Sequence, residues 1–392
     1  MFPETVNHPL GRKLRMALIG GGGNGFIGRV HATAAQLDQR AVLVAGALSS
    51  DPDRSRAAAA AFGIDSARAY GSYGELLDRE SALTNDERID FVSIATPNDT
   101  HFEIVRAALE AGLDVVCDKP LTTHVDDAEQ LARLVGQSGR VFALTHNYSG
   151  YPLVRQARAM IEAGELGEVQ SVRANYIQGH LCGLSPGAVP PRGAWKSDPQ
   201  RAGSGSLGDI GTHAFHLACY VTSWSPTHVA STLRTFHAER RLEDYGHVLL
   251  RCGDALGCIT FSQITHGRLN DLSLEVDGRD GSLSWQQEEP NQLVLRRFGQ
   301  PTQIYDRHPK AVYTKEPSRQ ACRLPAGHPE AFLEAFANIY RGAFNGMVAL
   351  RLGQGTAAGS GDYPTVHDGV QGVKFVAACQ ASHAANGSWV KI

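Results

Sequence analysis

The amino-acid sequence predicts an α/β protein, in which a doubly wound parallel sheet is followed by an α+β domain with a mostly antiparallel sheet. Over about the first 145 of 392 residues, short apolar segments alternate with segments of helical periodicity, which is typical of parallel strands covered by helices on both faces. Between Thr227 and Phe298, short strands separated by turn residues recur instead, as in antiparallel sheets. A chain of this length also favours two domains, which we assign to residues 1–145 and 146–392.

The first domain is predicted to contain five strands and four helices. Continuous apolar segments predict strands at 14–19, 41–48, 89–95, 114–117 and 141–144. Helical spacing predicts helices at 26–37, 54–62, 102–111 and 125–134. The helix at 54–62 has the clearest start, because Asp51 can cap it, Pro52 suits its first position and the segment is rich in alanine.

The second domain mixes helices with short strands. Helices are predicted at 151–163, 207–221, 329–344 and 366–384. Strands are predicted at 229–235, 248–252, 258–263, 272–276, 282–285 and 293–296. Residues 297–325 are polar and contain proline, so we expect irregular structure there.

Composition and charge exclude several classes of protein. The 37 Lys and Arg nearly balance the 40 Asp and Glu, giving a net charge of −3, whereas a nucleic-acid-binding protein would carry a basic excess or patch. No apolar stretch reaches the roughly 18 residues that a membrane span needs. Residues 1–12 lack the apolar core of a secretory signal, and the seven cysteines are scattered without a C-x-x-C pair. We therefore expect free thiols, no metal and a cytoplasmic location.

A glycine-rich loop joins the first predicted strand to the first predicted helix. It satisfies the pattern G-x-G-x-x-G twice, starting at Gly20 and again at Gly23. Glycine allows a tight turn and a close approach of the backbone to a pyrophosphate, and the helix N-terminus offers free N–H groups to the anion. This context at the start of a doubly wound pattern predicts a Rossmann dinucleotide-binding domain. The residues predicted to contact the cofactor here are Gly20, Gly22, Gly25, Phe26 and Ile27.

The end of the second strand bears on the choice between NAD and NADP. An acidic residue there would bind the ribose hydroxyl of NAD, but Asp51 has a structural alternative as a helix cap. The hydroxyls of Ser49 and Ser50 and the guanidinium of Arg54 would suit the 2′-phosphate of NADP. The residues leave both cofactors open and slightly favour NADP.

Polar groups follow two further strands at the edge where ligands bind in open α/β sheets. The side chains predicted to line the cofactor crevice at this edge are Thr96, Pro97, Asn98, His101, Asp118 and Lys119. Pro120 favours an extended conformation for Lys119, which gives its side chain a defined direction. A lysine at this place can stabilise a developing alkoxide, although an ordinary surface lysine is the alternative.

The helix predicted at 207–221 has an unusual polar face. Its apolar residues lie on one side, whereas Asp209, His213, His216 and Tyr220 lie opposite, without any Lys or Glu. Asp209 and His213 are four residues apart and therefore neighbours. Histidine is the usual general base, and an adjacent carboxylate can orient it. A purely structural pair, or a metal site that also uses His216, are the alternatives.

Taken together, several motifs resemble the Gfo/Idh/MocA family of nicotinamide-dependent oxidoreductases over nearly the whole chain. The motifs are GGGGNGFIGRVH at 20–31, ATPNDTH at 95–101, DKP at 118–120, GSLGDIGTH at 205–213 and NGSWV at 386–390. Asp118 departs from the glutamate usual in the family's Glu-Lys-Pro tripeptide, and the glycine loop is longer than usual. The resemblance implies that Lys119 and His213 meet at the substrate carbinol, with Asp209 beside them. It also implies a C-terminal sheet that is open on one face, where homodimers or homotetramers form, and final helices that pack back on the first domain.

The function predicted on this basis is hydride transfer between NAD or NADP and a secondary hydroxyl or keto group of a sugar, glycoside or cyclitol. Hydrogen-bonding and aromatic side chains expected near the crevice are Asn147, Tyr148, Tyr176, Gln178 and Trp195. These residues suit a polyhydroxylated substrate, with core packing as the alternative for the aromatic ones. Two other functions stay open: redox-assisted glycoside cleavage with recycled NAD, and a non-catalytic dinucleotide-binding regulator.

Overall fold

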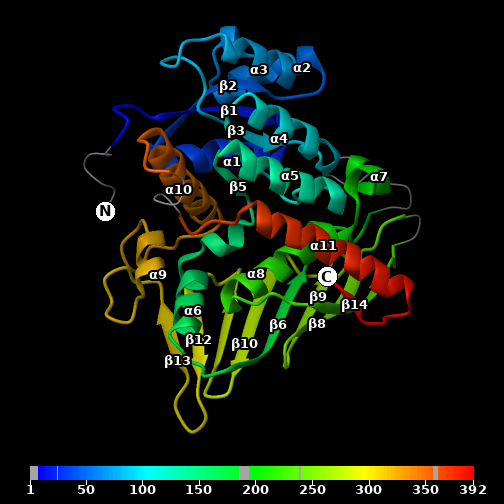
Figure 1. Ribbon diagram of the computed structural model, residues 1–392. Coiled ribbons are helices and arrows are strands. Elements are labelled where there is room, and N and C mark those ends of the chain that lie inside the picture. Colours follow the sequence, from blue (N-terminus) through cyan, green and yellow to red (C-terminus); the bar gives the residue numbers. More distant parts are fainter. Residues whose placement is uncertain (1–7, 24, 185–193, 238–239, 356–360) are drawn as a thin grey trace.

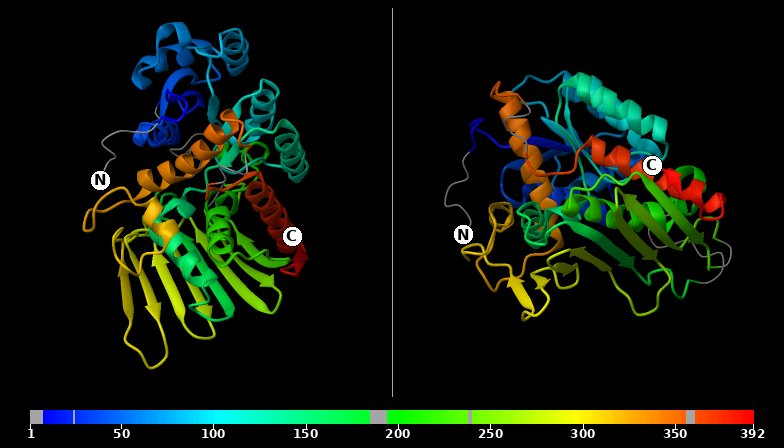
Figure 2. Two further views of the ribbon diagram at one scale, coloured as in Figure 1. Left: turned by 60° about the vertical axis from the view of Figure 1, so that its left-hand side comes forward. Right: turned by 60° about the horizontal axis from the view of Figure 1, so that its bottom comes forward.

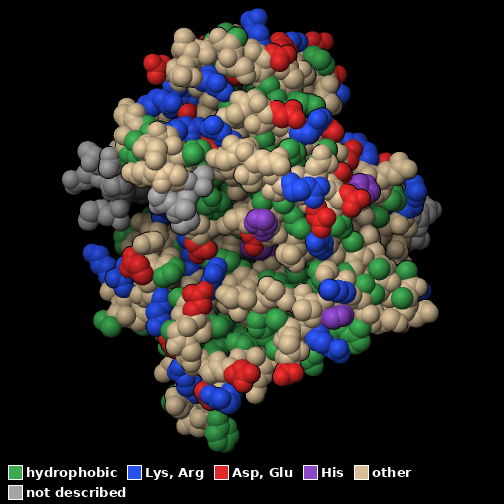
Figure 3. All heavy atoms as spheres, viewed as in Figure 1, with side chains coloured by type: hydrophobic (Ala, Val, Ile, Leu, Met, Phe, Trp, Pro, Cys, Tyr) green, Lys and Arg blue, Asp and Glu red, His purple; other side chains and the backbone are tan. Residues whose placement is uncertain are grey.

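The computed structural model describes residues 8–23, 25–184, 194–237, 240–355 and 361–392 (Figure 1). Within these residues the chain forms a five-stranded sheet and a nine-stranded sheet, which lie in the upper and lower parts of Figure 1. No helix in the described ranges combines the length and the apolar character needed to cross a membrane. On the face seen in Figure 3, basic and acidic side chains are interspersed.

The first sheet is parallel, with the strand order β2-β1-β3-β4-β5. Its strands are β1 (Leu14–Gly20), β2 (Ala41–Ala47), β3 (Phe91–Ala95), β4 (Asp114–Cys117) and β5 (Phe142–Leu144). The helices of this part are α1 (Phe26–Leu37), α2 (Pro52–Ala59), α3 (Tyr73–Ser81), α4 (His101–Glu110) and α5 (Val125–Ser138). Every residue of β1 and β3 is buried, which explains their continuous apolar sequences. The predicted doubly wound sheet is confirmed, whereas α3, which Ser72 caps, was not predicted.

The second sheet has the order β13-β12-β11-β10-β6-β9-β8-β7-β14 and is antiparallel except between β6 and β9. Its strands are β6 (Val169–Ile177), β7 (His228–Arg234), β8 (Tyr245–Cys252), β9 (Ala255–Ser262), β10 (Asp271–Gly278), β11 (Ser282–Gln286), β12 (Gln292–Arg296), β13 (Gln303–Asp306) and β14 (Val390–Lys391). Buried and exposed residues alternate along β8, as expected for a sheet with one solvated face. The prediction of a mostly antiparallel sheet is confirmed.

Helices cover one face of this sheet, as the two views of Figure 2 show. They include α6 (Pro152–Glu162), α8 (Thr212–Thr222) and α11 (Val366–Ala384). The prediction of irregular structure at 297–325 was partly wrong, because β13 and a short helix α9 (Glu316–Ala321) form there. β13 exists because it pairs with β12, a contact that the polar local sequence does not reveal. A short helix α7 (Pro199–Ala202) was also not predicted.

The last two long helices pack on the first sheet. Helix α10 (Phe332–Arg351) lies against α1, and its Phe336, Tyr340 and Phe344 join the apolar cluster under β1. Helix α11 lies against α5, and its N-terminal valines join the cluster on the other side of the sheet. The helix predicted at 329–344 therefore ended too early, whereas the helix at 366–384 has the predicted bounds.

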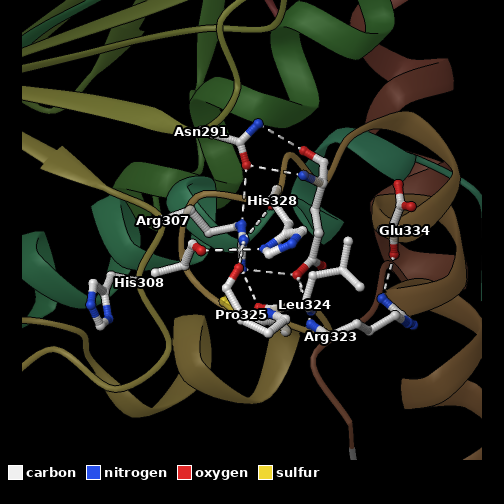
Figure 4. Close-up of polar contacts among 12 residues, drawn as sticks. Asn291, Arg307, His308, Arg323, Leu324, Pro325, His328 and Glu334 are labelled. Atoms are coloured by element: carbon white, nitrogen blue, oxygen red, sulfur yellow. Dashed lines mark hydrogen bonds and ion pairs between the residues drawn. The ribbon is translucent and has the colours of Figure 1, made fainter. Parts of the chain in front are cut away.

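A buried polar network holds together the segment before α10 (Figure 4), and its Arg323 links this segment to the first domain. Arg307 and Glu330 form a fully buried ion pair at 2.9 Å, and Asn291 accepts a hydrogen bond from each of them. Arg323 donates two hydrogen bonds of 2.7 Å to Asp38, the residue that follows α1. Helix α1, which begins at the glycine loop, is thereby held at its far end.

Candidate active site

Lys119 lies directly after β4, at the carboxyl edge of the parallel sheet, and its side chain is only 12% exposed. The carboxylate of Asp118 accepts hydrogen bonds of 2.9 Å from the Lys119 N–H and from the Thr145 hydroxyl, so it fixes the turn that carries the lysine. Burial lowers the pKa of Lys119, and the charge of Asp209 opposes this shift. The structure thus holds an ammonium group in a largely dry place.

Asp209 is the centre of a charged cluster. Its Oδ1 lies 3.2 Å from the Lys119 Nζ and 3.0 Å from the Lys196 Nζ, and its Oδ2 accepts a 2.8 Å hydrogen bond from Gln263. The Lys119 ammonium also donates to the main-chain oxygen of Asp209. Two ammonium groups therefore share one carboxylate, which disfavours the metal site considered for Asp209. No metal-binding group of three or more His, Cys, Asp or Glu side chains occurs in the described part of the chain.

The turn that carries Asp209 is not α-helical. Residues Leu207–Gly211 form a π-helical turn, and α8 begins only at Thr212, so the predicted helix at 207–221 was wrong over its first five residues. Glu243 binds the start of the turn by accepting hydrogen bonds from the N–H groups of Gly205 and Leu207. A side chain at Gly205 would meet the Glu243 carbonyl oxygen at 2.1 Å, so glycine is needed there. Such wide turns are frequent at functional sites.

His213 lies on the first turn of α8, near Lys119 and Asp209, and only 8% of the residue is exposed. Its ring centroid is 4.9 Å from that of Tyr148 and 5.4 Å from that of His146, in edge-to-face geometry. Burial lowers the pKa of His213 well below its usual value, and the charge of Lys119 adds to this while Asp209 opposes it. The imidazole is therefore neutral at neutral pH, which is the form that accepts a proton.

Polar side chains from the segment after β5 and from the end of β6 extend this site. The hydroxyls of Tyr148 and Tyr176 are 2.5 Å apart, and Tyr176 donates a 2.8 Å hydrogen bond to Asn270. Gln178 donates to the same Asn270 oxygen at 2.7 Å. Two buried atoms, Nδ2 of Asn147 and Oε1 of Gln178, have no hydrogen-bond partner within the described residues. The structure therefore brings four of the five predicted substrate residues to the His213 side of the site.

The fifth, Trp195, lies on the Asp209 side. It lines a small pocket together with Lys196, Asn98, Arg240, Asp209 and Gln263. Four residues of the site were not predicted from the sequence: Lys196, Gln263, Asn270 and His146. Only His146 carried a signal, because it directly precedes the predicted Asn147 and Tyr148 after a strand.

The glycine loop has the shape that a pyrophosphate cradle needs. Gly20 and Gly21 have φ angles of +80° and +72°, which other residues rarely adopt. A side chain on Gly22 would meet the Leu48 carbonyl oxygen at 2.6 Å, and one on Gly28 would meet the Gly21 oxygen at 2.4 Å. Among the described residues no side chain caps α1 at Gly25, so the first N–H groups of the helix can serve an anion. These residues fit a dinucleotide, with the exposed Phe26 and the adjacent Ile27 at the start of the helix.

At the end of β2, Asp51 takes the structural role that was its alternative. Its carboxylate accepts a 2.9 Å hydrogen bond from the Arg54 N–H and caps α2, and it also forms an exposed ion pair with the Arg54 side chain at 3.3 Å. Ser49 accepts a hydrogen bond from the Asp51 N–H, and Ser50 is exposed beside it. The three residues favoured for a 2′-phosphate are thus at the surface.

The segment after β3 connects the two halves of the site. Asn98, which follows Pro97, donates a hydrogen bond of 3.2 Å to the Ala202 carbonyl, and the Thr96 hydroxyl accepts one from Thr100. His101 is fully buried, with its ring nitrogens 2.8 Å from the Pro120 oxygen and 3.1 Å from the Thr96 oxygen. His101 therefore connects the loop after β3 to the loop after β4. Its direct contact with a cofactor stays a prediction.

A glycine loop shaped to receive a dinucleotide, at the first βα turn of a doubly wound parallel sheet, is typical of NAD-binding Rossmann proteins. Residues 14–146 match the family described as "Oxidoreductase family, NAD-binding Rossmann fold", and residues 154–284 match the "GFO/IDH/MocA C-terminal domain". The chain belongs to the Gfo/Idh/MocA family.

Three relatives cover most of the chain. The uncharacterized oxidoreductase YfiI of Bacillus subtilis is 31% identical over 97% of this chain and 98% of its own length. Levoglucosan dehydrogenase of Pseudarthrobacter phenanthrenivorans is 30% identical over 72% of this chain and 76% of its own. The crystal structure of an inositol dehydrogenase homolog from Azotobacter vinelandii, complexed with NAD⁺, superposes with a TM-score of 0.90 at 37% identity and covers 97% of this chain and 98% of that one.

Proposed function

We propose that this protein is an NAD(P)-dependent dehydrogenase or reductase that transfers a hydride between the cofactor and a secondary hydroxyl or keto group of a sugar, glycoside or cyclitol. The observation that carries the proposal is a buried ammonium, Lys119, that contacts Asp209, with the neutral imidazole of His213 close enough to feel the charges of both. The similarity to a levoglucosan dehydrogenase and to an inositol dehydrogenase homolog supports polyhydroxylated rings as the substrate class.

In this mechanism each protein side chain has one task. The nicotinamide, when bound, accepts or donates the hydride. His213 accepts the hydroxyl proton of the substrate, because its buried ring is neutral. Lys119 donates a hydrogen bond to the same oxygen and stabilises its developing negative charge. Asp209 holds the Lys119 ammonium in position, and reduction runs through the same groups in reverse.

Substrate binding is assigned to the polar groups on both sides of the reacting centre. Asn147 and Gln178 each offer a buried, unpartnered polar atom to a hydroxyl group, within the described residues. Tyr148 and Tyr176 add a hydroxyl pair and aromatic surface. Trp195 offers a second aromatic surface on the Asp209 side.

The cofactor is NAD or NADP, held at Gly20, Gly22 and Gly25 and by the strand-end residues named above. The half-buried Ser49 and the exposed Ser50 and Arg54 slightly favour NADP. Arg54 is 79% exposed, so a 2′-phosphate could replace its weak contact with Asp51 at little cost.

A second copy of this chain is the expected protein partner. The face of the nine-stranded sheet opposite the helices carries the exposed Leu249, Leu256 and Ile304. We infer that this face forms a homodimer or homotetramer. Light scattering after gel filtration measures the assembly, and a monomer at micromolar concentration would contradict it.

The test of the function is a screen of sugars, glycosides and cyclitols with both cofactors, following nicotinamide absorbance. Lys119→Ala and His213→Ala should each lose most turnover, about 10²–10⁴-fold, while they still bind cofactor. Near-normal turnover in either variant would refute its assigned role. Release of an aglycone without net change in absorbance would instead indicate redox-assisted cleavage with recycled NAD.

A further inference from the structure

Three buried histidines form a row that starts at the proposed reacting centre and leads away from it. His146 follows β5, while His213 and His216 lie one turn apart on α8. The ring of His146 meets His213 edge to face, with centroids 5.4 Å apart, and stacks on His216 at 4.4 Å and 8°. All three residues are less than 9% exposed. The proposed mechanism uses only His213.

Each of the three rings has a nitrogen that the described residues leave unsatisfied. These atoms are Nδ1 of His213, Nδ1 of His146 and Nε2 of His216. Buried polar atoms are usually hydrogen-bonded, and buried water commonly bridges those that protein groups do not reach. Three such atoms on adjacent rings therefore favour a water-bridged polar path. Direct transfer between the parallel rings of His146 and His216 is excluded, because stacking directs their N–H groups past each other.

The far end of the row reaches the surface. The Nε2 of His216 lies 3.7 Å from Oδ1 of Asp368, whose side chain is 39% exposed. Asp368 sits in the first turn of α11, and its other oxygen accepts hydrogen bonds from the N–H and the hydroxyl of Thr365. Burial raises the pKa of Asp368, but its contact with His216 and these hydrogen bonds outweigh it, so its pKa lies well below the usual value and Asp368 passes a proton on rather than keeping it. A carboxylate thus stands between the row and the solvent.

Alcohol oxidation makes such a path necessary, because each turnover releases one proton. His213 is almost completely buried, and the pKa of His146 is also lowered well below its usual value, by burial and by the neighbouring His216, His213 and Lys119. Neither ring keeps a proton for long. The alternative exit through Asp209 is disfavoured, since Lys119 and Lys196 both contact that carboxylate and its side chain is only 20% exposed, against 39% for Asp368.

We propose that His146 and His216, with bridging water, carry the substrate proton from His213 to Asp368 and so to the solvent. The inference rests on the proposed function. The hydroxyl proton passes to His213, one proton then shifts along each link, and one proton leaves to bulk water, so that all three imidazoles return to their starting state. Reduction takes up one proton by the same path. His146 and His216 are positioning residues for the proton, since neither contacts the reacting atoms.

The experiment compares hydride transfer with proton release in a single turnover. Stopped-flow absorbance follows the nicotinamide, and a pH indicator in weak buffer follows the released proton. The variants are His146→Gln, His216→Gln and Asp368→Asn in the full-length protein. The matched control is Asp362→Asn, because Asp362 is similarly exposed and accepts a hydrogen bond from Tyr220 of the same helix, but lies outside the row. Thermal unfolding of each variant checks that it folds.

In the His216→Gln and Asp368→Asn variants we expect the rate of hydride transfer to stay within about twofold of the parent rate. The rate of proton release should fall at least about tenfold, which is smaller than the usual effect of removing a general base. Added imidazole buffer should restore the release, which a purely structural defect would not allow. The control should release its proton together with the hydride step. Synchronous release in all three variants would overturn the path. A parent protein that transfers no hydride to any polyol would instead refute the proposed function.

Discussion

Removing the charge of Asp209 tests how the site controls Lys119. Asp209→Asn keeps the shape of the side chain but deletes a negative charge 3.2 Å from the Lys119 Nζ. At an effective dielectric constant of about 20, Coulomb's law gives about 5 kcal/mol for unit charges at this distance. The amide dipole and water will compensate much of this loss. We therefore expect the pKa of Lys119 to fall by at least about one unit, equivalent to about 1.4 kcal/mol.

The pH profile of kcat/KM reports this shift. Lys119 stabilises the substrate oxygen only while it is protonated, so a lower pKa moves the alkaline limb of the profile to lower pH. Nicotinamide absorbance between about pH 6 and 10 measures both limbs. Lys196→Met is the matched control of opposite sign, because Lys196 lowers the pKa of Lys119 and its removal should move the limb to higher pH. An unchanged alkaline limb in Asp209→Asn, or the same direction of shift in both variants, would refute the reasoning.

Three further outcomes are expected. Burial alone would raise the pKa of Asp38, but ion pairs with Arg323 and Arg341 outweigh it and lower the pKa to about 2. Asp38 therefore stabilises the fold by about 2 kcal/mol above about pH 4, and this contribution is lost as the pH falls toward 2. The free energies of urea unfolding of Asp38→Asn and the parent should differ at pH 7 and converge in acid. Gly28→Ala should weaken cofactor binding at least about tenfold, because its Cβ would lie 2.4 Å from the Gly21 oxygen, and calorimetric titration with an unchanged affinity would contradict the cradle. Arg54→Ala should lower the ratio of kcat/KM with NADP to that with NAD, and a strong parent preference for NAD would contradict the role of Arg54.

Much of the fold could be predicted because its signals are local. Buried parallel strands have continuous apolar sequences, as in β1, and the cap Asp51 with Pro52 marks the start of α2. The misses have tertiary causes. β13 depends on pairing with β12, and α10 continues to Arg351 because that arginine binds Asp90 and Asp114 of the first domain. The π-helical turn at 207–211 depends on Glu243, which lies more than thirty residues away.

The candidate site divides in the same way. The glycine loop, Lys119 after its strand and His213 on its helix were recognisable from neighbouring residues in the chain. The resemblance already implied Asp209 beside Lys119 and His213, and the structure brings Lys119 to it from 90 residues away. The other two partners of Asp209, Lys196 and Gln263, had no signal in the sequence.

The sequence alone thus determined the alternation of strands and helices and the glycine loop, because these depend on periodicity and on backbone conformations that few residues adopt, and it offered Lys119, Asp209 and His213 as candidates. Only the tertiary structure decided that Lys196 and Gln263 share the Asp209 carboxylate with Lys119, and that His146 and His216 continue from His213 toward Asp368. The physical reason is that charge pairing, desolvation and ring packing act across space between segments far apart in the chain. No local pattern records those distances.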